Sequence, residues 1–69
     1  MRVQVRRLPR PNVDEDVEVR DGATVHDVLR VIGVAPDAVV VMREDAPLPV
    51  DAPVAAGERL RVFAVFSGG

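Results

Sequence analysis

Ser67, Gly68 and Gly69 are the residues best suited to chemistry, because they form a slender tail that ends in a carboxyl group. Glycine lacks a Cβ atom, so such a tail can thread a slot too narrow for any other residue. When extended, these three residues reach ~10 Å. A carboxylate is a poor electrophile until ATP activates it, and a phosphate-binding loop requires a lysine, which this 69-residue chain lacks. We therefore expect no cofactor bound to the chain and a partner enzyme that uses ATP to activate the tail.

The sequence contains few residues that could form another kind of reactive site. His26 is the only histidine, Ser67 is the only serine and cysteine is absent, so neither a nucleophile–base pair nor a zinc site can be assembled. We expect His26 to be an exposed residue at the start of a helix. The sequence therefore predicts a protein that is not an enzyme and holds no metal.

Composition also restricts the partners. The net charge is -2, and the only aromatic residues are Phe63 and Phe66, so direct nucleic-acid binding is not expected. No apolar stretch approaches the ~18 residues of a membrane span, and neither a signal peptide nor a cysteine indicates secretion. We expect a cytoplasmic protein without membrane contacts. Because lysine is absent, chains linked through its own lysine side chains are excluded.

Alternating residues predict a hairpin at the start of the chain. Residues 1–8 place Val3, Val5 and Leu8 on one side of a strand, with Arg2, Gln4 and Arg6 on the other. The prolines in residues 9–12 break this strand, and residues 13–20 resume the alternation. Residues 1–10 hold four arginines, whereas the second strand is acidic, so we expect ion pairs across the hairpin.

A change of period then predicts a helix. Apolar residues stand at i, i+3, i+4 and i+7, namely Val25, Val28, Leu29 and Ile32. Thr24 is placed to cap the N-terminus together with Asp27, and Gly33 can adopt the left-handed conformation that ends a helix. The expected helix has about ten residues and one apolar face.

The rest of the chain completes an α+β fold. We expect a turn at Pro36 and Asp37, a strand at 39–43, a brief edge strand near Leu48 and a central strand at 60–66. The predicted architecture is a mixed four- to five-stranded sheet packed on one helix, with the first and last strands parallel neighbours. Residues 1–66 would form one domain, and 67–69 a flexible, reactive tail.

Four features together resemble the ubiquitin-like β-grasp sulfur carriers and small archaeal modifier proteins: the element order, DGATV at 21–25, GERL at 57–60 and the terminal SGG. The resemblance covers essentially the whole chain. It implies that an E1-like enzyme adenylates Gly69, with Gly68 as its slender neighbour. The activated glycine is then converted to a thiocarboxylate or joined to a lysine of a target protein. A sulfur donor protein and a sulfur-accepting biosynthetic enzyme would be further partners.

The resemblance leaves the pathway open. APDAVV at 35–40 and AVFSGG at 64–69 are similar to the bacterial carrier for tRNA 2-thiouridine synthesis, whereas DGATVHDVL at 21–29 is similar to thiamine-pathway carriers. The small subunit of molybdopterin synthase usually has a proline pair where Ala64 and Val65 stand, which makes that assignment the weaker one. The alternative from another class is a non-covalent β-grasp interaction module, in which the terminal glycines have no role.

Alternation assigns a partner-binding face. The inward side chains of the third and last strands are predicted to be Val39, Val41, Leu60, Val62 and Ala64. The outward ones are predicted to be Val40, Met42, Arg61, Phe63 and Val65, flanked by Gln4 and Arg6. An exposed apolar patch rimmed by arginine is typical of a protein-binding surface. Phe66 points inward by parity, and either caps the core or anchors the tail in a partner.

Overall fold

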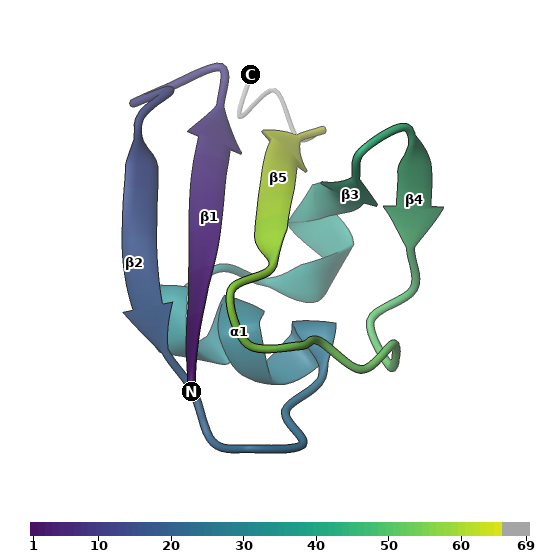
Figure 1. Ribbon diagram of the computed structural model, residues 1–69. Helices are drawn as coiled ribbons and strands as arrows, with labels where there is room; N and C mark the ends of the chain where they lie inside the picture. The colour runs from purple at the N-terminus through teal and green to yellow at the C-terminus, as the bar shows by residue number, and fades with distance from the viewer. Residues whose placement is uncertain (66–69) are drawn as a thin grey trace.

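Five strands form one mixed sheet, and a helix lies across one of its faces (Figure 1). The computed structural model describes residues 1–65. In chain order the elements are β1 (Arg2–Leu8), β2 (Asp14–Glu18), α1 (Val25–Ile32), the 3₁₀ turn η1 (Pro36–Ala38), β3 (Val39–Arg43), β4 (Ala46–Leu48) and β5 (Arg59–Ala64). The strand order is β2-β1-β5-β3-β4, with β1 and β5 parallel. This is the predicted architecture, in its five-stranded form.

The β1–β2 hairpin has the predicted ion pairs. Arg6 Nε lies 3.0 Å from Asp14 Oδ1, and Arg7 Nε lies 2.9 Å from Glu15 Oε2. The second strand is shorter than the predicted 13–20. The position predicted for Leu8 was wrong: strict alternation from Val3 and Val5 places Arg7 on the helix side, and Leu8 pairs with Phe63 on the opposite face.

Local sequence signals fix the ends of α1, which has 8 residues rather than about ten. The Asp27 amide donates to Thr24 Oγ1 at 3.4 Å, and the Thr24 amide donates to Asp27 Oδ2 at 2.9 Å, so the predicted capping box is present. Gly33 ends the helix with φ 75°, a conformation that costs side-chain-bearing residues energy. The placement of His26 on the surface is confirmed.

The segment between β4 and β5 supports the helix start. Amides at the first turn of a helix have no partner within the helix. Here the Val25 amide donates to the Ala52 carbonyl at 2.9 Å, and the His26 amide donates to the Val50 carbonyl at 2.8 Å. Within the proline-rich residues 44–58 the only strand is the brief edge strand β4, as predicted.

The central position of β5 is confirmed, but its predicted end was wrong. The strand ends at Ala64, which pairs with Val39, the first residue of β3. Val65 lies beyond the strand, and its amide donates to the Ala38 carbonyl at 3.0 Å. Ala64 has inward parity but is exposed, not buried. Phe66 lies outside the described residues.

The core between sheet and helix consists of valines, two leucines and one alanine. Its buried members are Val3, Val5, Val17, Val19, Ala23, Val25, Val28, Leu29, Val41, Val54, Leu60 and Val62. The helix and all four long strands contribute to this core, and within residues 1–65 no helix covers the other face of the sheet (Figure 1). No helix within residues 1–65 has both the length and the apolar character needed to cross a membrane.

Candidate functional site

The uncovered face of the sheet, here called the outer face, is built by the register of β1, β5 and β3. Leu60 and Val62 are buried on the helix side, so Arg59, Arg61 and Phe63 take the alternate side. The ladders then set rows across the three strands. One row is Leu8, Phe63 and Val40, and the next is Arg6, Arg61 and Met42. Sequence alternation therefore predicted the correct face for Arg6, Val40, Met42, Arg61 and Phe63.

The first row forms an apolar patch. Val40 is 40% exposed on β3. Phe63 is less exposed than predicted, because Leu8 and Val40 stand opposite it on the two neighbouring strands and the Arg61 guanidinium lies 5.9 Å from its ring centroid. A central-strand aromatic flanked in this way keeps only part of its ring in water, which suits an anchor for a partner side chain.

Two further predicted members of the face differ in exposure. Met42 is partly buried rather than solvent-exposed, because Arg61 and Pro47 stand opposite it on the two adjacent strands. Val65 is 58% exposed just after β5 and extends the apolar surface toward the end of the chain. Val65 therefore lies between the sheet and the residues for which we predicted a reactive role.

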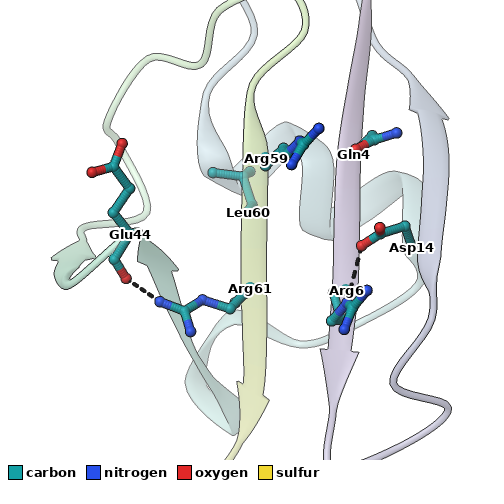
Figure 2. Close-up of a pocket in the computed structure, with 7 residues that line it drawn as sticks. All are labelled: Gln4, Arg6, Asp14, Glu44, Arg59, Leu60 and Arg61. Atoms are coloured by element: carbon teal, nitrogen blue, oxygen red, sulfur yellow. Dashed lines mark hydrogen bonds and ion pairs between the residues drawn. The ribbon is translucent and has the colours of Figure 1, made fainter.

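Arginines occupy the second row. Arg6 and Arg61 are direct neighbours on parallel strands, which brings two positive charges together. Opposite partners draw them apart (Figure 2). Arg6 donates to Asp14 Oδ1 at 3.0 Å on the β2 side, whereas Arg61 donates to the backbone carbonyl of Glu44 in the β3–β4 turn. A hollow of about 310 Å³ lies between them.

The ion pair fixes the charge state of this side of the site. The hydrogen bond from Arg6 holds the pKa of the Asp14 carboxyl below its usual range, and the charges of Arg6 and Arg59 act in the same direction. The same hydrogen bond raises the pKa of the Arg6 guanidinium. Arg6 and Asp14 are therefore both charged near neutral pH, so their ion pair persists across the physiological range.

Sequence reasoning missed two members of the outer face. Arg59 lies one step along β5 from Arg61 and stands opposite Gln4, within the same hollow (Figure 2). Leu8 completes the apolar row beside Phe63. Strict period-2 counting from Arg61 and from Val5 would have found both.

The predicted reactive residues Ser67, Gly68 and Gly69 lie outside the described residues, as does Phe66. What the structure describes is the strand that precedes them: β5 has paired neighbours on both sides. No cluster of three or more His, Cys, Asp or Glu side chains suited to a metal ion occurs within residues 1–65.

Comparison with known proteins places this chain in a family. The family model described as small archaeal modifier protein 2 matches residues 1–66. An uncharacterized protein from Archaeoglobus fulgidus is 33% identical over 69 residues, which is 100% of both chains.

Two solved structures resemble the fold over its whole length. SAMP1 from Haloferax volcanii has a TM-score of 0.77 and 22% identity and covers 100% of both chains. The ubiquitin of Caldiarchaeum subterraneum has a TM-score of 0.72 and 19% identity, covering 100% of this chain and 98% of the other. The chain therefore belongs to the small archaeal modifier protein 2 family and is a small ubiquitin-like modifier with the β-grasp fold.

Proposed function

We propose that this protein is a sulfur carrier and protein modifier whose Gly69 carboxyl group is adenylated by an E1-like enzyme. The observation that supports this most is the position of β5. This strand is held in the centre of the sheet up to Ala64, and the sequence runs from it directly into a tail that ends in Gly68 and Gly69. Family membership over residues 1–66 supports the same function.

Activation supplies the electrophile that the chain itself lacks. A carboxylate oxygen of Gly69 attacks the α-phosphorus of ATP in the partner enzyme, pyrophosphate leaves, and an acyl adenylate forms. The neighbouring Gly68 has no side chain to obstruct entry into the partner's active site. ATP is bound by the partner throughout, so this chain needs no cofactor of its own.

Two nucleophiles can then take the acyl group. Attack by the terminal sulfur of a persulfide on a sulfur donor protein releases AMP and gives an acyl disulfide. A further thiol then attacks the donor protein's sulfur, forms a disulfide with it and releases the Gly69 thiocarboxylate. Attack by the amine of a target lysine instead releases AMP and forms an amide bond. The first route supplies sulfur to a biosynthetic enzyme, and the second attaches the protein to a target.

We assign the sulfur to tRNA 2-thiouridine synthesis in the cytoplasm, on the strength of the APDAVV and AVFSGG segments described above. The thiamine and molybdopterin pathways are the alternatives. The discriminating experiment supplies the thiocarboxylate form to extracts of cells that lack their own carrier. Restored 2-thiouridine in bulk tRNA supports the assignment, and restored thiamine or molybdopterin with unchanged tRNA contradicts it.

The outer face has the complementary role of docking the activating enzyme. Phe63, Val40 and Val65 offer apolar surface, while Arg6 and Arg61 offer charge, beside the strand that leads to the tail. The test of the whole proposal is a variant with one alanine appended after Gly69, incubated with the E1-like enzyme, ATP and Mg²⁺. The proposal requires that only the unextended protein forms an acyl adenylate. Equal behaviour of both proteins, with no adenylate, would favour a non-covalent interaction module.

A further inference from the structure

The hollow of the outer face, here called the arginine hollow, is lined by more arginine side chains than its own acidic side chains pair with. Three arginines line it, namely Arg6, Arg59 and Arg61. Asp14 is paired with Arg6, and Glu44 offers Arg61 only its backbone carbonyl, while its carboxylate is directed away (Figure 2). The Arg59 side chain makes no ion pair within residues 1–65.

The arrangement is costly without a ligand. Like charges directly opposite one another on neighbouring strands are destabilising. Arg6 and Arg61 occupy such a pair, and Arg59 adds a third positive charge one step along the same face. An anion seated between the three guanidinium groups would relieve this repulsion and accept charge-assisted hydrogen bonds from more than one arginine.

The surroundings select the kind of anion. On the β2 side the hollow is bordered by the outward acidic side chains of Asp14 and Asp16, and the whole chain has a net charge of -2. A long polyanion such as RNA would meet these acids along its backbone, and repulsion would oppose it. Asp14 lines the hollow, but its carboxylate is already paired with Arg6, so a single carboxylate meets less repulsion there than a polyanion that runs along β2.

The next row along the strands is apolar. Phe63 follows Arg61 along the outer side of β5, and Val40 stands beside Phe63 on β3. A bound segment that carries a carboxylate next to an aliphatic side chain would therefore place the first over the arginines and the second on Phe63. Because the arginine row and the apolar row follow one another along the strands, such a segment would run along β5, with the acids of β2 to one side.

We propose that the hollow between β1 and β5 is a carboxylate-binding site that docks an acidic and apolar segment of a protein partner. Arg6, Arg59 and Arg61 bind the carboxylate, and Phe63 receives the neighbouring aliphatic side chain. That this partner is the activating enzyme rests on the function proposed above. The site itself rests on the charges and register of the described residues.

The test uses the ¹⁵N-labelled protein and a short synthetic peptide that alternates glutamate with leucine. We expect the peptide to shift the amide signals of Gln4, Arg59, Arg61 and Phe63. A matched peptide with glutamine in place of glutamate removes the charge and should bind at least about tenfold more weakly, the equivalent of 1.4 kcal/mol. Equal binding of both peptides would overturn the assignment of a carboxylate.

Matched variants test whether the peptide binds at the arginine hollow. Arg59→Gln should weaken binding of the glutamate peptide about tenfold, because a hydrogen bond between charged groups is lost. Arg30→Gln on the exposed side of α1 should leave binding unchanged, since Arg30 also makes no ion pair within residues 1–65 and lies in the opposite layer. Retained amide dispersion in both variants establishes that they are folded. Equal losses in the two variants would contradict a specific site.

A competing ligand tests whether the bound anion is instead a phosphate group of a nucleic acid. Single-stranded polyuridine that binds more tightly than the peptide and shifts the same signals would overturn the proposal in favour of a phosphate site. The peptide experiment does not involve the tail, so its outcome is independent of activation. If Gly69 is activated and the peptide does not bind, this site is wrong and the proposed function stands. If the peptide binds and Gly69 is never activated, this site stands and the proposed function is wrong.

Discussion

Phe63→Ala is the perturbation that best examines the outer face as a docking surface. Phe63 is partly buried between Leu8 and Val40 and carries Arg61 over its ring at 5.9 Å. Truncating a fully buried phenylalanine costs 3–5 kcal/mol, so a partly exposed one should cost roughly 2 kcal/mol of folding stability. The lost cation–π contact adds about 0.5–1 kcal/mol.

The expected loss of binding free energy is of similar size. A central aromatic anchor in an interface contributes about 2 kcal/mol or more on truncation, which corresponds to roughly 30-fold in Kd. The measurement is calorimetric titration of the E1-like enzyme with the wild-type protein and the variant at a temperature where both are folded. Phe63→Leu, which keeps apolar bulk, should recover most of the affinity.

Val31→Ala provides the matched control, because Val31 is 58% exposed and lies on α1 in the opposite layer. It should leave the Kd unchanged. If folded Phe63→Ala binds the enzyme within about threefold of the wild type, the outer face is not the docking surface. The same conclusion follows if Val31→Ala weakens binding as much as Phe63→Ala does.

Three further predictions address the scaffold and the tail. Thr24→Ala removes the helix cap and should lower the free energy of unfolding by about 1 kcal/mol in urea titrations, whereas Thr24→Ser should be nearly neutral; equal losses would mean that the cap contributes little. The hydrogen bond to Glu18 is the main reason why the pKa of the Met1 α-amino group is raised in the folded protein. The stability that the charged amino group contributes is therefore complete below about pH 8 and is lost as the pH rises through the group's folded-state pKa. Glu18→Gln should therefore be destabilising at pH 7 in the same titrations, with a difference that shrinks by pH 10; a difference independent of pH would contradict this. Appending one alanine after Gly69 should leave the Kd for the activating enzyme within a few-fold of the wild type and abolish ATP–pyrophosphate exchange, while continued exchange would contradict the role of Gly69.

Local signals predicted most of the fold. The capping box of Thr24 and Asp27, the left-handed Gly33 and the alternation around Val3 and Val5 each depend on residues close in sequence, and each appears in the structure. The central position of β5 followed from its apolar composition. These features are decided by short-range geometry, so one sequence is enough to find them.

Features that depend on neighbours across the sheet were harder to predict. The partial burial of Phe63 and Met42 results from Leu8, Val40 and Pro47 on adjacent strands, whose register the sequence does not state. The exposure of Ala64 similarly depends on how far the neighbouring elements extend over the end of β5.

The arginine hollow was missed for the same reason. Arg6 and Arg61 are far apart in sequence and become neighbours only through the parallel pairing of β1 and β5. Arg59 joins them through alternation along β5, and its position beside Gln4 follows from the same register. A charge count along the sequence gives a net charge of -2 and does not reveal this local excess.

Intact mass spectrometry of the C-terminal group tests the central claim most directly. The protein is incubated with the E1-like enzyme, ATP, Mg²⁺, a persulfide sulfur donor and a thiol reductant, in parallel with the variant extended by one alanine. We predict a gain of about 16 Da, the mass difference between sulfur and oxygen, that maps to Gly69 and is absent from the extended variant. An unchanged mass, obtained with an enzyme shown to be active on another modifier of the same cell, would contradict activation of this tail.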